Sequence, residues 1–237
     1  MADFLLIHGS CHGAWCWRDL IPQLTALGHS ARAIDLPGHG DDPTPLAEAT
    51  LEGCRDAILA ASGPQTIVLG HSWGGYPISA AAEAAPEKMR GLIYLCAYVP
   101  ISGLSMVEMR KRAARQPLMP AVRRSEDGLS FDFDPAQVPE LFYHDCPQAA
   151  VAYAMPRLCP QATRPQATPL EVTGRWQGVP KAYIRCSEDR AIPPEYQAEM
   201  VQDWPRDRVF TLPTSHSPFF SDPAGLAALL DRIAAVL

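Results

Sequence analysis

The chain has 237 residues, of which 47% are hydrophobic and 19% are charged, and its formal net charge is -6. This length and composition predict one globular domain with a sizeable core and exclude a disordered chain. The negative charge favours neither nucleic acid nor an anionic membrane as a partner. No apolar stretch reaches the roughly 20 residues that a membrane-spanning helix needs.

The cysteines and the N-terminus indicate a cellular compartment. The seven cysteines are scattered and form no Cys-x-x-Cys pair, so they predict neither a zinc site nor a thioredoxin-like motif. Dispersed thiols are typical of a reducing compartment. The apolar run at the N-terminus is short and lacks a positive flank, which predicts a strand rather than a signal peptide. We therefore expect a cytoplasmic protein.

Short apolar runs alternate with longer amphipathic stretches. In chain order we expect a strand at 4–7, a helix at 15–27, a strand at 31–36, a helix at 51–61 capped by Thr50, a strand at 66–69, a helix at 75–85, a strand at 92–97, a strand at 182–186, a helix at 194–202, a strand at 209–212 and a helix at 224–236. Strands separated by helices predict a mostly parallel six-stranded sheet with helices on both faces.

Residues 101–177 interrupt this alternation. The segment is rich in proline, methionine and aromatic residues, and it is too long for a loop in a compact domain. We expect a mostly helical cap, inserted into a core made of residues 1–100 and 178–237. It should lie over the carboxyl ends of the strands, where ligands bind in open α/β sheets. Its basic cluster, Arg110 to Arg115, is interpreted as a solvated helix face.

The strongest motif is Gly70-His71-Ser72-Trp73-Gly74. It matches G-x-S-x-G and lies between a predicted buried strand and a predicted helix. Glycines allow the sharp turn that lifts a serine hydroxyl to the top of the sheet of an α/β-hydrolase. The motif therefore predicts Ser72 as a nucleophile.

A serine hydroxyl needs a general base, and in this fold the chain order is serine, acid, histidine. Five histidines precede Ser72 or adjoin it and are excluded by this order, while His144 falls in the predicted cap. His216 follows the last strand and is the predicted base. His71 is expected to be a packed, hydrogen-bonded side chain that points away from the turn.

The acid is expected at the end of the strand at 182–186. Asp189 is the first choice there, and Glu188 is the alternative. Asp35 precedes the serine in the chain, so it is expected to be structural. The acid would hold the imidazole tautomer and stabilise the imidazolium while staying ionised.

Two backbone N–H groups are predicted to stabilise the oxyanion. One belongs to Trp73, directly after the nucleophile, and the other to Ser10 in the loop after the first strand. Cys11 lies in the same loop, but no base accompanies it, so we expect a small loop residue rather than a second nucleophile.

These residues resemble one branch of the α/β-hydrolase superfamily. The segment 8–17, His-Gly-Ser-Cys-His-Gly-Ala-Trp-Cys-Trp, is similar to its H-G-x-x-H-G-A-W-x-W signature. Segments 70–75, 142–146, 175–176 and 183–189 are also similar to that branch. The branch includes plant-type methyl esterases, among them the salicylic-acid-binding esterase, together with hydroxynitrile lyases and bacterial relatives.

Two departures from the lyases favour the esterases. The lyases carry Thr after the first His of the signature and Lys after the catalytic His, whereas this chain has Gly9 and Ser217. The resemblance therefore implies hydrolysis of small esters of apolar acids.

These residues and the resemblance together predict a serine esterase that forms an acyl-enzyme intermediate, without a metal or cofactor. It would act on a small-molecule ester as a monomer or homodimer. Lactone or carbon–carbon bond hydrolysis, lyase activity and a receptor for a small acid are the alternatives. The predicted substrate pocket, for which ordinary packing is an equal explanation, comprises Gly9, Cys11, Phe131, Phe142, Ser217 and Phe219.

Overall fold

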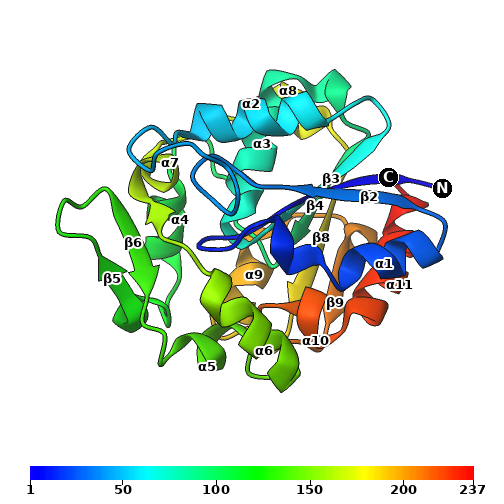
Figure 1. The fold of residues 1–237 in the computed structure, drawn as a ribbon. Helices are drawn as coiled ribbons and strands as arrows, with labels where there is room; N and C mark the ends of the chain where they lie inside the picture. The colour runs from blue at the N-terminus through cyan, green and yellow to red at the C-terminus, as the bar shows by residue number, and fades with distance from the viewer.

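A computed structural model describes all residues from Met1 to Leu237. Its centre is a six-stranded sheet in the order β2-β1-β3-β4-β8-β9, in which every neighbouring pair is parallel (Figure 1). The strands are β1 (Asp3–Ile7), β2 (Ser30–Ile34), β3 (Thr66–His71), β4 (Gly91–Leu95), β8 (Lys181–Cys186) and β9 (Val209–Leu212). The predicted α/β-hydrolase fold is confirmed.

The core lies on both faces of this sheet. Successive side chains of a strand point to opposite faces, and in β1 Phe4 and Leu6 join one apolar cluster while Leu5 and Ile7 join the other. One face is covered by α1 (Leu20–Ala26) and α11 (Pro223–Ala234), and the other by α2 (Leu51–Ala61), α3 (Gly75–Ala84), α8 (Gly174–Gly178) and α9 (Pro194–Met200) (Figure 1). Strands buried on both faces explain the short, continuous apolar runs of the sequence.

One predicted helix is divided. The segment 15–27 forms a 3₁₀ turn at Ala14–Trp17 and then α1. Pro22 explains the break, because it lacks an N–H and its ring would clash with the carbonyl four residues earlier in a continuous helix. When the helix begins at Leu20, Pro22 falls in the first turn, where no intrahelical N–H bond is needed. The other core elements agree with the prediction to within about two residues, and Thr50 Oγ1 accepts the Gly53 N–H at 2.9 Å as an N-cap.

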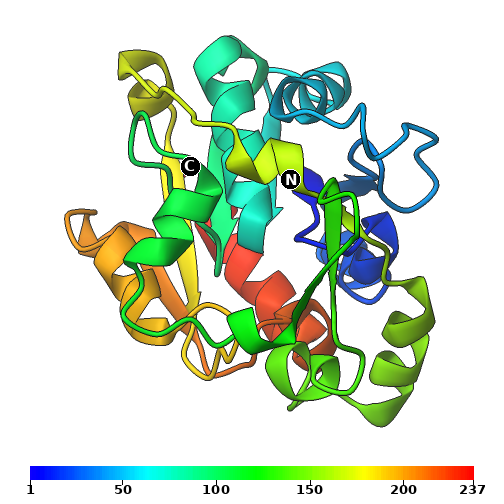
Figure 2. The same ribbon diagram turned by 90° about the vertical axis from the view of Figure 1, so that its left-hand side faces the viewer.

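Most of the 101–177 segment lies at the carboxyl ends of the parallel strands, whereas its end, in α8, lies beside α3 on one face of the sheet (Figures 1 and 2). The segment contains helices α4 (Met106–Arg112), α5 (Val138–Phe142), α6 (Gln148–Ala154) and α7 (Thr163–Ala167). It also contains a three-stranded antiparallel sheet of β5 (Val122–Arg124), β6 (Ser130–Phe133) and β7 (Gln161–Ala162), which the expectation of a mostly helical cap missed. Gly128, with φ +70°, makes the turn between β5 and β6.

The chain ends with α10 (Pro218–Ser221) and α11. None of the helices combines the length and the apolar character needed to cross a membrane.

Candidate active site

Ser72 stands at a strained turn between β3 and α3. Its φ is +57°, a left-handed conformation that costs a non-glycine residue free energy and occurs mainly at functional sites. A Cβ at Gly70 would lie 2.6 Å from the Gly74 carbonyl oxygen, and one at Gly74 would lie 2.8 Å from the His8 carbonyl oxygen. Both flanking positions of the motif therefore require glycine for steric reasons.

His216 and Asp189 form a buried pair beyond the ends of β9 and β8. The Nδ1–H of His216 donates to Asp189 Oδ2 at 2.7 Å. Gln197 Nε2 donates to the same oxygen at 2.8 Å, and the N–H groups of Ala191 and Ile192 donate to Oδ1 at 2.7 and 2.9 Å. Four donors thus compensate for the burial of the carboxylate charge. Because Nδ1 of His216 is bonded to Asp189, Nε2 is the nitrogen that can accept a proton from another group.

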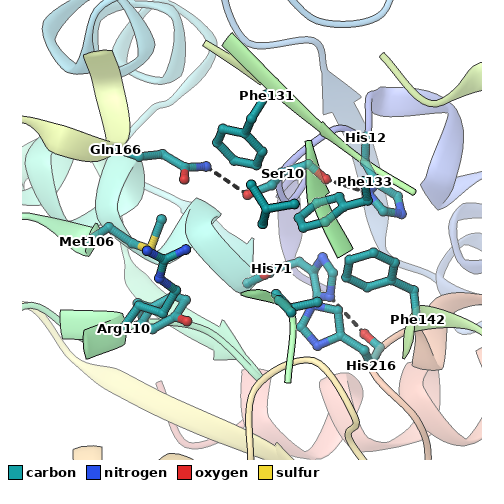
Figure 3. Close-up of a pocket in the computed structure, with 14 residues that line it drawn as sticks. Ser10, His12, His71, Met106, Arg110, Phe131, Phe133, Phe142, Gln166 and His216 are labelled. Atoms are coloured by element: carbon teal, nitrogen blue, oxygen red, sulfur yellow. Dashed lines mark hydrogen bonds between the residues drawn. The ribbon is translucent and has the colours of Figure 1, made fainter. Parts of the chain in front are cut away.

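Ser72 and His216 border the same cavity (Figure 3). No hydrogen bond joins the Ser72 hydroxyl to His216. In unliganded enzymes this contact is often long and shortens when substrate binds. The arrangement can remove a proton from Ser72 once the hydroxyl and Nε2 approach.

The other two acidic candidates lie apart from this pair. Glu188 is exposed, and its backbone carbonyl accepts a bond from His144 Nε2 at 2.9 Å. Asp35 accepts the N–H groups of Ala14 and Asp41. Asp35 therefore joins the loop after β1 to the loop after β2, which agrees with the structural role that we expected from the sequence.

Ser10 borders the cavity and is held there by its neighbours. Its hydroxyl accepts a bond from Gln166 Nε2 at 2.7 Å, and its carbonyl accepts the His12 Nδ1–H at 2.7 Å. Its own N–H donates to no group of the protein, so it is available to an oxygen in the cavity. Trp73 is buried in the 3₁₀ turn at Ser72–Gly74, directly before α3, and the N-terminal end of a helix attracts negative charge.

Three buried histidines stabilise the loops around Ser72. Burial lowers the pKa of His12 to about 4 and lowers the pKa values of His8 and His71 well below the ordinary value. His12 accepts from the Tyr143 hydroxyl at 2.6 Å, so its ring bridges the first loop and the 101–177 segment. All three side chains are neutral near pH 7.

His71 differs in one respect from its prediction. It is packed and hydrogen-bonded, because its Nε2 donates to the His216 carbonyl at 2.8 Å. However, it does not point away from the site: its ring centroid lies 4.5 Å from that of His216, and it borders the cavity (Figure 3). The backbone turn at Ser72 and the contact with His216 together explain this orientation.

The free space inside the cavity is small, about 30 Å³, which is room for about two water molecules. A substrate can therefore enter only when the bordering side chains move. Besides Ser72 and His216 the cavity is bordered by apolar and aromatic side chains and a few polar ones: Ser10, His12, His71, Tyr98, Met106, Arg110, Leu118, Val122, Phe131, Phe133, Phe142 and Gln166. Most of them come from the 101–177 segment.

Only two of the six side chains predicted for the pocket, Phe131 and Phe142, border the cavity. Four others lie elsewhere: Gly9, Cys11, Ser217 and Phe219. Cys11, with φ +61°, belongs to a separate depression. Phe219 is buried against His71 at 5.1 Å between ring centroids. Ser217 and Phe219 are fully buried in the packed interior, and Gly9 has no side chain to reach the cavity.

Arg110, Tyr98 and Gln166 border the cavity and were not predicted. The basic cluster had been assigned to a solvated face, but Arg110 faces inward while Lys111 and Arg112 are exposed. Helical spacing contained the signal, because Arg110 follows the buried Met106 by four residues and therefore shares its face.

Only one group of side chains has metal-ligand character: atoms of His71, Cys96 and His216 lie within 4.8 Å of one another. The Cys96 thiol and His71 Nε2 both donate to the His216 carbonyl. Packing around the His216 backbone therefore accounts for the grouping.

The parallel sheet, the serine turn and the His–Asp pair define a hydrolase of the α/β class. The model of the alpha/beta hydrolase family matches residues 4–229, and the chain belongs to this family. Methylesterase 7 of Arabidopsis thaliana is 34% identical over 98% of this chain and 95% of its own length. A pyrethroid hydrolase of Sphingobium wenxiniae is 32% identical over 96% and 85%.

Solved structures agree with these relatives. A pyrethroid hydrolase from Sphingobium faniae has a TM-score of 0.87 at 31% identity, over 99% of this chain and 97% of that one. Polyneuridine aldehyde esterase has a TM-score of 0.87 at 26% identity, over 99% of both chains. The resemblance to the methyl esterase branch is confirmed, and the chain is a carboxylic ester hydrolase.

Proposed function

We propose that this protein is a serine esterase for small carboxylic esters, with Ser72, His216 and Asp189 as its catalytic triad. The observation that carries the proposal is that the strained Ser72 and the buried His216–Asp189 pair open onto one cavity. The relatives named methylesterase and pyrethroid hydrolase support an ester as substrate.

In the proposed mechanism, Ser72 Oγ attacks the ester carbonyl carbon while His216 Nε2 takes the hydroxyl proton. Asp189, held by four donors, stabilises the imidazolium that forms. The tetrahedral intermediate collapses, and His216 gives the proton to the departing alcohol, which leaves an acyl-enzyme. Water, deprotonated by His216, then attacks the acyl-enzyme and releases the acid and free Ser72.

The backbone N–H groups of Ser10 and Trp73 would stabilise the negative charge on the carbonyl oxygen. The unpartnered Ser10 N–H and the position of Trp73 at a helix start support this role. A single such donor is typically worth about 3 kcal/mol of barrier.

Hydrolysis is favoured over a lyase reaction by the space around Gly9. A Cβ at this position would lie 2.7 Å from His71 Nδ1 and 2.9 Å from Ser72 Cβ, so the threonine of the lyases has no room in this packing. Ser217, at the position of the lyases' lysine, supplies no cation for a departing cyanide.

Residues 101–177 would act as a cap that shapes the acyl site. Phe131, Phe133 and Phe142 give the cavity an apolar wall, which suits esters of largely apolar acids. The dispersed free thiols favour a cytoplasmic protein, active as a monomer or homodimer on a small-molecule ester without a cofactor.

The test is labelling by a fluorophosphonate together with hydrolysis of a panel of p-nitrophenyl esters, methyl esters and lactones. The wild type should be labelled and should hydrolyse esters faster than lactones, and Ser72→Ala should lose both labelling and hydrolysis. Labelling or hydrolysis that persists in Ser72→Ala would refute Ser72 as the nucleophile. A preference for lactones would favour the alternative reaction on the same triad.

A further inference from the structure

The cavity contains a positive charge that no other residue neutralises. Arg110 comes from α4, and its guanidinium forms no hydrogen bond or ion pair with any residue, while its Nε is buried. Arg110 is half-buried, so its guanidinium loses part of its hydration without gaining a partner in the protein. An anionic ligand would compensate for that loss.

The surroundings of Arg110 contain no anion. None of the 14 side chains that border the cavity is Asp or Glu. The exposed Glu108 on the same helix caps Ser105 through a bond of 2.8 Å to its N–H, and Gln166 donates to Ser10. Burial lowers the pKa of Arg110, yet a guanidinium stays protonated in proteins.

Arg110 and the aromatic wall lie on different sides of the cavity. Figure 3 shows Arg110 beside Met106 on one side, with Phe133 and Phe142 across from them. The Tyr98 hydroxyl also borders the cavity. The cavity thus offers the reacting serine, an apolar wall and a separate cationic end.

We propose that the substrate carries a carboxylate at the end of its apolar chain remote from the ester, and that Arg110 binds this carboxylate. This inference rests on the proposed esterase function and specifies its substrate class as half-esters of dicarboxylic acids. The planar guanidinium can hold a carboxylate through two parallel hydrogen bonds. Desolvation inside the cavity strengthens such a pair relative to water.

The first measurement compares kcat/KM for monomethyl glutarate, adipate and suberate with that for the matching terminal primary amides. The amide has nearly the same shape and no charge. In the wild type, kcat/KM for the best half-ester should exceed that for its amide by at least about 10-fold. Arg110→Gln should lower kcat/KM for the half-ester by roughly 10²-fold and change that for the amide little. Arg110→Lys should retain part of the preference because it keeps the charge.

Arg112→Gln is the matched control, since Arg112 is exposed on the same helix, and it should behave like the wild type. Fluorophosphonate labelling of Arg110→Gln verifies that its site is still folded. A wild type that prefers the amide, or an Arg110→Gln variant that loses activity equally on both substrates or on neither, would overturn the proposal.

A second measurement does not require catalysis. Adipate, the product of one half-ester, should raise the melting temperature of the wild type and of Ser72→Ala more than the uncharged adipamide does. Arg110→Gln should lose this difference. If no ester were hydrolysed but adipate still stabilised the protein through Arg110, the esterase proposal would fail and the carboxylate site would stand. Equal shifts with adipate and adipamide would overturn the carboxylate site.

Discussion

At the scale of single residues, the carboxylate beside His216 accepts the most hydrogen bonds of any side chain in the site. Four hydrogen-bond donors fix both oxygens of Asp189. The neighbouring Glu188 is exposed to solvent, so two adjacent carboxylates have very different surroundings.

Asp189→Asn should lower kcat by roughly 10⁴, because an amide cannot hold the tautomer of His216 that accepts the serine proton. Glu188→Gln serves as the control and should retain nearly full activity. Steady-state kinetics on a p-nitrophenyl ester would measure both, with circular dichroism to verify folding. Greater loss in Glu188→Gln than in Asp189→Asn would transfer the role of the acid to Glu188.

At the scale of elements, the strands β5 and β6 supply much of the cavity wall. Val122, Phe131 and Phe133 come from this hairpin. Phe131 and Phe133 contact each other edge to face, with 5.6 Å between ring centroids. The hairpin lies apart from the core strands that carry Ser72 and His216, so it can change without moving them.

Phe131→Ala should shift the preference of the enzyme toward longer acyl chains, by roughly 10-fold in the ratio of hexanoate to acetate esters. The reason is that each methylene in an apolar pocket contributes about 1–3 kcal/mol. The measurement is kcat/KM over a series of p-nitrophenyl esters. Leu129→Ala is the control, because Leu129 lies next to the same strand but is 49% exposed; an unchanged ranking in Phe131→Ala would place specificity in the core loops.

Sequence patterns predicted the core elements better than the 101–177 segment. Continuous apolar runs such as 66–69 are typical of strands buried on both faces, and the glycines of the 70–74 motif are fixed by clashes that any side chain would cause. The β5–β6 hairpin has strands of three and four residues. Such short strands give little periodicity, although Asp127-Gly128 and the alternation of Ser-Phe-Asp-Phe were signals of a turn and a strand.

The candidate site was predictable where its chemistry depends on chain order, and less so where it depends on packing. Ser72, Asp189 and His216 follow from the motif and the order of strands. Arg110 and Gln166 enter the cavity through the fold of a segment whose helices have five to seven residues. Their direction depends on contacts between distant parts of the chain.

At the scale of the whole molecule, the buried neutral histidines connect stability to pH. His12 has a pKa of about 4 in the folded protein and an ordinary value near 6.5 when unfolded. Above pH 6.5 neither state binds the proton, so the histidine contributes no pH dependence. Between about pH 6.5 and pH 4 the unfolded state binds the proton first, and the free energy of unfolding falls as the pH is lowered.

Lowering the pH from 7 to 5 should therefore cost the wild type about 2 kcal/mol more than it costs His12→Asn, which cannot titrate. Urea denaturation at several pH values would measure this difference. His144→Asn is the control and should keep the slope of the wild type, since His144 lies at the periphery and is only half-buried. Equal slopes in the wild type and His12→Asn would contradict a neutral, buried His12.

The order of the strands also has an evolutionary consequence. Residues 101–177 lie in the chain between β4 and β8, yet these two strands pair directly with each other. The pairing of β4 with β8 therefore does not require a particular length of the intervening segment. Mutations can accumulate in this segment, and whole hairpins can be gained or lost, while the strands that lead to Ser72, Asp189 and His216 keep their order. New substrate preferences can thus arise by changes in this segment while the order of the core strands stays the same.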